Sequence, residues 1–111
     1  MLKNISTKKV IAVDIKVCRS AFSKARGLMF SKKRALLFVF NKEKKVSLHM
    51  FFVFFPIDVL YLSKNKKVVE VIKSFKPFTC YTPNHKAQYI IELPAGTIKA
   101  TKTKIEHVLN F

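Results

Sequence analysis

Hydrophobic and other residues alternate along residues 10–17, which is the first clear pattern in the chain. Ile11, Val13, Ile15 and Val17 fall on one side of an extended backbone, and the residues between them fall on the other side. Successive side chains of a β-strand point to opposite faces, so a period of two predicts a half-buried strand here.

The next segment changes to helical spacing. Ser20 is a residue type that caps helix N-termini, and Phe22 and Ala25 recur at the spacing of one helical turn. Gly27 is suited to stop the helix, because glycine enters the left-handed region at no steric cost. We therefore expect one short helix near the N-terminus, from Ser20 through about Leu28.

From there onward the chain reads as short strands separated by turns. The expected strands cover residues 35–40, 46–53, 57–62, 67–73, 87–93 and 105–111. Pro56 predicts a bend, because proline cannot donate to a central ladder. Turns are expected at 63–66 and 94–96, residues 75–86 form the longest irregular stretch, and the polar segment 97–104 stays undecided. Regularly spaced short strands predict an antiparallel all-β sandwich or open barrel.

Composition narrows the class of protein. The 111 residues make one domain, 1–111, and half of them are hydrophobic, which excludes a wholly disordered chain. Gly27 and Gly96 are the only glycines, so glycine-rich phosphate and dinucleotide loops are excluded. The longest apolar run, residues 48–62, is shorter than a bilayer span and contains Pro56 and Asp58, so we expect no membrane insertion.

The charge raises a question about partners. There are 22 cations and 6 acids, a formal net charge of +16. Such a field attracts nucleic acid, anionic membranes or acidic partners. Yet 19 of the cations are Lys and only three are Arg, the residue that recognises bases and phosphates with a planar fork. We interpret the lysines as a solvated surface and keep RNA or single-stranded DNA binding as an alternative.

The two cysteines, Cys18 and Cys80, are too few for a disulfide scaffold. No zinc-ligand spacing surrounds Cys18, and we expect neither a metal nor a cofactor. Residues 1–9 are polar and lack the apolar core of a signal peptide. These observations predict a cytoplasmic protein.

Three segments in order carry a resemblance to a known family. They are Arg26-Gly27-Leu28-Met29-Phe30, then the segment from His49 to Val59 with Pro56-Ile57-Asp58, then Ile91-Glu92-Leu93-Pro94-Ala95-Gly96. Over residues 18–111 the chain resembles domain of unknown function 192, also called uncharacterised protein family 0127, in its short archaeal type. The resemblance implies a compact, jelly-roll-like β-sandwich with a short helix near the N-terminus, and it implies no activity.

The chain departs from that family at two places. Many relatives read Trp-Met-Lys-Asn-Thr where this chain has His49-Met50-Phe51-Phe52-Val53, so a polar trio has become apolar. Relatives often carry Gly-Asp where this chain has Glu106-His107. The Pro-x-Asp element survives.

Asp58 is the most conspicuous candidate residue, because an ionised carboxylate in an apolar run is costly unless it is paired. We expect an architectural role, either at a sheet edge or in a pair with Arg26. A functional carboxylate is the alternative for Asp58, and an anion-binding group is the alternative for Arg26.

Four other residues are candidates for a binding or structural site. His49 lies in an apolar strand, where a hydrogen-bonded, half-buried histidine is the ordinary case. Cys80 and His85 share the irregular loop, and their types would suit a nucleophile–base pair or half a metal site. Glu92 precedes a turn, where it either satisfies backbone donors or faces Asp58 as a general acid or base.

Three functional hypotheses follow. The first is a non-enzymatic binding module whose pocket, beside residues 49–58 and 75–86, accepts a small ligand, a peptide or an acidic partner. The cluster of Phe51, Phe52, Phe54 and Phe55 favours it, because alternation sends successive rings to opposite faces and one set needs a cover. The second is nucleic-acid binding through the basic surface. The third is a small hydrolase or isomerase that uses Asp58 and Glu92, with His85 or Cys80 as further candidates.

Overall fold

The computed structural model describes residues 1–19, 35–49 and 55–111, except for the side chain of His49. The expected helix at 20–28, with Arg26 inside it, lies outside the described residues. The same holds for Phe51, Phe52 and Phe54 of the phenylalanine cluster, whereas Phe55 is described and packs, partly buried, against the core.

The described part of the chain is mainly β. Its strands are β1 (Leu2–Asn4), β2 (Lys9–Ala12), β3 (Ile15–Cys18), β4 (Ala35–Lys44), β5 (Leu48–His49), β6 (Ile57–Leu62), β7 (Val68–Phe75), β8 (Cys80–Tyr81), β9 (Ala87–Pro94) and β10 (Leu109–Asn110). One helix, α2 (Thr97–Thr101), follows β9. No helix among the described residues is long and apolar enough to cross a membrane.

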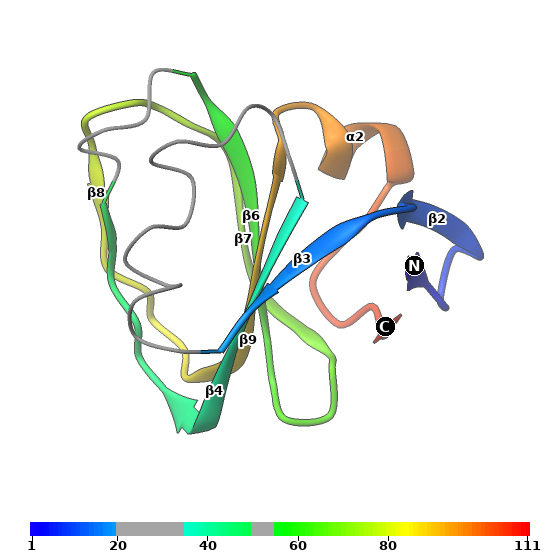
Figure 1. The fold of residues 1–111 in the computed structure, drawn as a ribbon, viewed down its shortest axis with the longest axis horizontal. Helices are drawn as coiled ribbons and strands as arrows, with labels where there is room; N and C mark the ends of the chain where they lie inside the picture. The colour runs from blue at the N-terminus through cyan, green and yellow to red at the C-terminus, as the bar shows by residue number, and fades with distance from the viewer. Residues whose placement is uncertain (20–34, 50–54) are drawn as a thin grey trace.

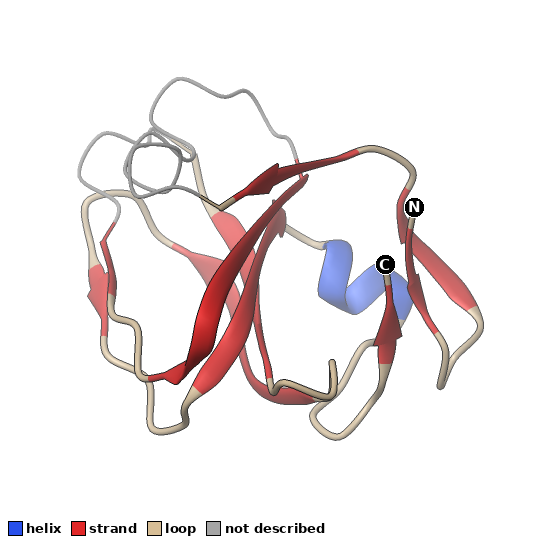
Figure 2. Ribbon diagram, turned by 60° about the horizontal axis from the view of Figure 1, so that its bottom comes forward, coloured by secondary structure: helices blue, strands red, loops and turns tan. Residues whose placement is uncertain are grey.

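The strands form three layers, visible in Figures 1 and 2. A five-stranded sheet in the order β3-β4-β9-β6-β7 lies in the middle. The small β5-β8 sheet lies on one side of it, and the β10-β1-β2 sheet lies with α2 on the other. The predicted mainly β, antiparallel sandwich is confirmed, with one exception: β3 runs parallel to β4.

The core is divided between the two faces of the central sheet. The first face carries Phe38, Tyr61 and Ile90, and Leu48 of β5 and Tyr81 of β8 pack against it. The second face is covered by residues of the β10-β1-β2 sheet and of α2. Its buried members are Leu2, Ala35, Leu37, Leu60, Leu62, Val68, Ile91, Leu93, Ile98 and Leu109. Every residue of β6 is buried, because β6 lies between β9 and β7 with both faces covered.

The first predicted strand is divided in the structure. The alternating segment 10–17 belongs partly to β2 and partly to β3, which lie in different sheets. The chain crosses between the sheets at Val13 and Asp14, and the Val13 side chain is 68% exposed. Strands that switch sheets in this way form the corners of sandwiches. The alternation predicted extended chain correctly but gave no sign of the crossing.

Several turn predictions are confirmed. The Lys66 amide donates to the Ser63 carbonyl at 2.9 Å and closes the hairpin between β6 and β7. Gly96 adopts φ +93°, which glycine tolerates, at the start of α2. The undecided segment 97–104 contains this helix, and β10 occupies only residues 109–110 of the expected last strand.

Asp58 ties three elements together. Its Oδ1 accepts a hydrogen bond from the Ser74 amide of β7 at 2.9 Å, and its Oδ2 accepts one from the Ile98 amide of α2 at 2.9 Å. Gly96, at the helix N-cap, has no side chain to accept that amide, so Asp58 serves as a cap from 40 positions away. Ser74 has φ +54° where β7 bulges. Asp58 thus binds backbone donors, and the expected place at a sheet edge is wrong because β6 is an inner strand of the central sheet.

A second buried polar group joins the two ends of the chain. Asn4 Nδ2 donates to Thr103 Oγ1 at 3.1 Å and to His107 Nδ1 at 3.2 Å, while its Oδ1 accepts from the Thr7 amide at 3.1 Å. The Lys104 amide also donates to His107 Nδ1, at 3.1 Å. His107 therefore has a structural role here.

We predict that Asp58→Asn lowers the free energy of unfolding by about 1–3 kcal/mol at pH 7, because an amide accepts with one end only and leaves a buried N–H without a partner. Asp58→Ala removes both acceptors and is expected to cost more. Urea unfolding followed by circular dichroism measures both variants. Asp14→Asn, the same substitution at an exposed position, is the control. Equal stability of Asp58→Asn and this control would contradict the anchoring role.

Candidate functional site

The structure places Asp58 and Glu92 on opposite faces of the central sheet. Val59 of β6 pairs directly with Glu92 of β9, and Asp58 pairs with Leu93. Paired residues share a face and neighbours along a strand do not. The carboxyl of Asp58 therefore points to α2 while that of Glu92 points to the first face. The two do not come together as the facing acid and base that the enzyme hypothesis requires.

Glu92 is a buried acid in apolar surroundings. Its cross-strand neighbours on the first face are Leu36 and Val59, which are fully buried, and its own side chain is 8% exposed. Burial raises the pKa of Glu92 from the usual 4.5 to about 8, because the ionised form loses its hydration. At neutral pH Glu92 is therefore mostly protonated and can donate a proton or a hydrogen bond.

Glu70, which the sequence analysis did not single out, forms the densest polar cluster in the described chain. Its carboxylate accepts from the Tyr81 hydroxyl, from the Asn84 amide at 3.0 Å, and from the His85 amide at 3.1 Å and Nδ1 at 2.9 Å. Burial alone would raise the pKa of Glu70, but these hydrogen bonds together lower it below its usual value. Glu70 is thus an ionised anchor that fixes the 81–85 loop to β7.

Two tyrosines complete this cluster. The hydrogen bond to Glu70 and burial raise the pKa of the Tyr81 phenol to about 12. Tyr61 packs beside Tyr81, with ring centroids 6.1 Å apart, and its hydroxyl donates to the Val46 carbonyl at 3.2 Å. Burial, followed by the nearby charge of Glu70, raises the pKa of Tyr61 well above its usual value. Neither phenol ionises near neutral pH, so we assign this cluster a structural role.

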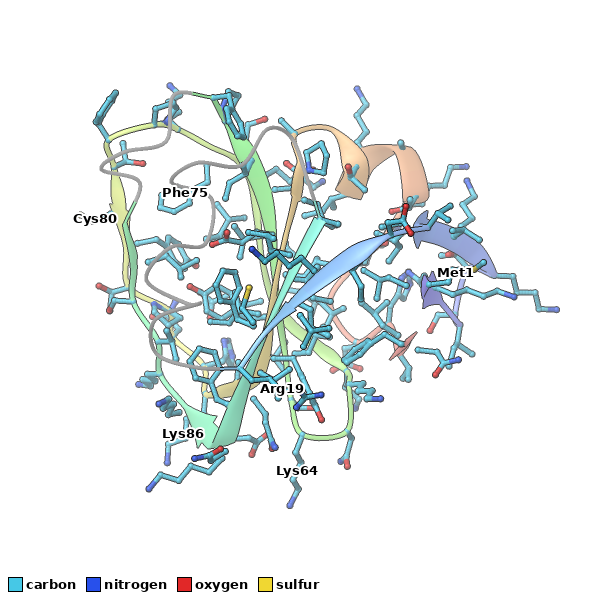
Figure 3. The ribbon with its side chains drawn as sticks, viewed as in Figure 1. Met1, Arg19, Lys64, Phe75, Cys80 and Lys86 are labelled. Carbon is cyan, nitrogen blue, oxygen red and sulfur yellow. The ribbon has the colours of Figure 1, made fainter. Side chains whose placement is uncertain are left out.

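The remaining sequence candidates are dispersed. The backbone of His49 pairs with that of Cys80, whose side chain is exposed in β8. Figure 3 shows Cys80 on the side of the central sheet away from Met1. The His85 ring contacts Glu70, and no hydrogen bond joins it to Cys80 in the described residues. The described chain also holds no cluster of three or more His, Cys, Asp or Glu residues placed to bind a metal.

A groove of about 250 Å³ opens on the second face, where β3 and the two chain ends meet. We call it the terminal groove. It is lined by Met1, Ile15, Val17, Arg19, Leu37, Val39, Lys66, Tyr89 and Phe111. Most of these side chains are apolar, and β3, β4 and β9 supply five of them. It lies away from the place beside residues 49–58 and 75–86 where the sequence analysis expected a pocket.

The walls of the terminal groove are held by specific contacts. The rings of Tyr89 and Phe111 meet edge to face, with centroids 5.1 Å apart. The Lys66 ammonium lies 4.2 Å from the centroid of the Phe111 ring and donates to the main-chain oxygen of Phe111 at 3.2 Å. These contacts hold Phe111 and the β6–β7 hairpin as one wall. Arg19, labelled in Figure 3, follows the end of β3.

Sequence reasoning missed the groove because its residues come from distant segments. Its one local signal was the alternation of Ile15 and Val17, which places both on the same face. A signal for Glu70 did exist: it is the single acid in a strand of β-branched residues, and buried acids in such strands need partners. Arg19 and Lys66 carry no local signal that distinguishes them from the other cations.

We predict that Glu70→Gln destabilises the protein by about 1–3 kcal/mol at pH 7, because an uncharged amide accepts these donors poorly. The pKa of Glu70 is lowered on folding, so its contribution is complete above pH 4.5 and is lost as the pH falls through the lower folded-state value. Urea unfolding at pH 7 and pH 3 should show the difference from wild type shrink at pH 3. With Glu106→Gln as the exposed control, a difference independent of pH would refute the role assigned to Glu70.

We predict the opposite pH dependence for Glu92→Gln. Below pH 4.5 the carboxyl is protonated in both states, whereas between pH 4.5 and about 8 only the unfolded state ionises. Wild-type stability is therefore lost across this interval by up to about 1.4 kcal/mol per pH unit, and the uncharged variant escapes that loss. Unfolding at pH 5 and pH 8 measures it. The account fails if wild type and variant change in parallel, as wild type and Glu106→Gln should.

Comparison with solved structures supports the fold. A protein of Sinorhizobium meliloti described as a "putative transcription regulator" superposes with a TM-score of 0.87 at 19% identity, over 98% of this chain and 88% of that chain. A protein of unknown function from Novosphingobium aromaticivorans gives 0.79 at 16% identity, over 87% of this chain and 74% of that one. At such identities the likeness shows the fold alone.

Comparison with other sequences shows the family. The family model DUF192, described as "Uncharacterized ACR", matches residues 2–111. A UPF0127 protein of Pyrococcus horikoshii is 39% identical over 80% of this chain and 79% of its own length. Another, from Thermococcus sibiricus, is 36% identical over 95% of this chain and 70% of its own length. These archaeal relatives are named UPF0127 proteins, the resemblance in the sequence is thereby confirmed, and the chain belongs to the DUF192 family.

Proposed function

We propose that the protein is a non-enzymatic binding module that holds a small ligand in the terminal groove. The observation that carries the proposal is the groove itself, a concavity of about 250 Å³ that combines apolar side chains with the polar groups of Arg19, Lys66 and Tyr89. Small-molecule sites likewise combine apolar surface with a few polar groups, and they lie where elements of a rigid scaffold meet.

The size and rigidity of the groove support a small ligand rather than a folded partner. Its volume suits a molecule of roughly ten non-hydrogen atoms, if each atom takes somewhat less space than the ~30 Å³ of a water. Leu37 and Val39 are fixed in β4, and Tyr89 is fixed in the neighbouring strand β9. A preformed site of this kind loses little entropy when it binds.

Two alternative functions have less support. For an enzyme, the facing pair of Asp58 and Glu92 is missing, and Glu70 is already occupied by four donors. For RNA or single-stranded DNA, a stripe of lysines beside exposed aromatic rings would be favourable. Exposed lysines instead occur in both large sheets and in α2, including Lys3, Lys16 and Lys99. Nucleic-acid binding and the cytoplasmic location both stay predictions.

The proposal is tested with 1-octanol, a neutral probe of suitable length, by saturation-transfer NMR. We expect transfer from the protein to the alkyl chain and a Kd on the order of 1 mM, as the small size of the probe implies. Val17→Trp should abolish the transfer, because Val17 lines the groove and a larger ring fills it.

Val13→Trp is the matched control. Val13 is the same residue type two positions earlier, is 68% exposed, and does not line the groove. The Val13→Trp variant should therefore bind the probe like wild type. If the octanol signal is absent from wild type, or persists unchanged in Val17→Trp, the groove is not the binding site and the proposal is wrong.

A further inference from the structure

The charged side chains that line the terminal groove all have one sign. Arg19 and Lys66 line it, and both carry a positive charge at neutral pH. All six acidic residues belong to the described part of the chain, and none of them lines the groove. No acidic side chain pairs with Arg19 or Lys66 among the described residues, and the Lys66 ammonium donates to the main-chain oxygen of Phe111 at 3.2 Å. An apolar floor thus adjoins two cations that lack an acidic side-chain partner.

Lys66 differs from an ordinary solvated lysine because its position is fixed. Its backbone lies in the left-handed region at φ +62°, its amide donates to the Ser63 carbonyl, and its carbonyl accepts from the Leu109 amide at 2.9 Å. Its ammonium is held against the ring and the main-chain oxygen of Phe111. The entropy of ordering a lysine side chain has therefore been lost on folding, before any ligand arrives.

Arg19 supplies the second cation. It follows Val17 and Cys18 of β3, whose pairing with β4 fixes the backbone from which the guanidinium extends. A guanidinium presents several N–H donors in one plane and binds a carboxylate or a phosphate through two parallel hydrogen bonds. Such bonds are stronger than those between neutral groups and add directional preference.

We propose that the natural ligand of the terminal groove is an anionic amphiphile, with a carboxylate or phosphate head at Arg19 and Lys66 and an apolar body of about ten atoms or fewer on the floor. This inference rests on the proposed function and deepens it by naming the ligand class. Charge complementarity carries it, because a neutral ligand would leave both cations without an anionic side-chain or ligand partner and a cationic ligand would be repelled.

The test compares matched probes by isothermal titration calorimetry. Octanoate, 1-octanol and octylammonium share one chain and differ in head charge. We expect octanoate to bind on the order of tenfold more tightly than octanol, the gain typical of charge-assisted hydrogen bonds, and octylammonium to bind more weakly than either. Hexyl phosphate distinguishes the two anionic heads, and tighter binding of either anion supports the proposal. Acetate, which has a head but no chain, should show no binding.

Variants separate a built site from the general attraction of a +16 protein for anions. Arg19→Gln and Lys66→Gln should each remove most of the advantage of octanoate over octanol. Lys64→Gln removes the same charge from the same hairpin outside the groove and should leave the advantage intact. A comparable loss in Lys64→Gln would overturn the proposal, since it would mean that net charge alone attracts the anion.

The failures of the two proposals are distinguishable. If none of the eight-carbon probes binds, the groove is not a ligand site and the proposed function fails together with this inference. If octanol and octanoate bind the wild type with equal affinity and neither binds the Val17→Trp variant, the groove is a ligand site but the inferred anionic head is wrong.

Discussion

Burial of β6 on both faces is the constraint on which the rest of the structure depends. A strand in the middle of a sheet, with six buried residues in succession, requires a cover on each side. The β10-β1-β2 sheet and α2 supply one cover, and β5 and β8 contribute to the other. Each polar group placed on these strands must then find a partner inside the protein or change its protonation state.

The three buried acids meet this constraint in different ways. Asp58 accepts hydrogen bonds from backbone amides of β7 and α2, so it joins these two elements. Glu70 accepts hydrogen bonds from the 81–85 loop, including the Tyr81 phenol, so it remains ionised. Glu92 has apolar neighbours and responds with a raised pKa. The charged side chains that line the terminal groove are cations, and there two of them adjoin apolar surface.

The fold could largely be predicted from the sequence, because alternation, proline and glycine are local signals. The strands at 57–62 and 87–93 and the turn at 63–66 lie where these signals placed them. These local signals contain no information about which strands pair with each other. The sheet crossing at Val13 and the parallel pairing of β3 with β4 were therefore missed, and so was the amide of Ile98 as a partner of Asp58.

The candidate site was harder to predict for the same reason. Asp58 was expected to be architectural from the cost of burying charge, but the partners it has lie 16 and 40 positions away and were not predicted. Arg26 lies outside the described residues, so its proposed pair with Asp58 stays a prediction. The terminal groove draws on residues from Met1 to Phe111, and only the three-dimensional arrangement brings Arg19 and Lys66 to one concavity.

The most direct test of the central claim, that the terminal groove is the ligand site, is a map of amide chemical-shift changes by ¹H–¹⁵N NMR during titration with octanoate. The account predicts changes centred on Val17, Arg19, Val39, Lys66 and Tyr89, with the amides of Tyr61, Tyr81 and Glu92 unaffected. Changes centred on Tyr61, Tyr81 and Glu92 would place the ligand on the opposite face of the central sheet and contradict the account.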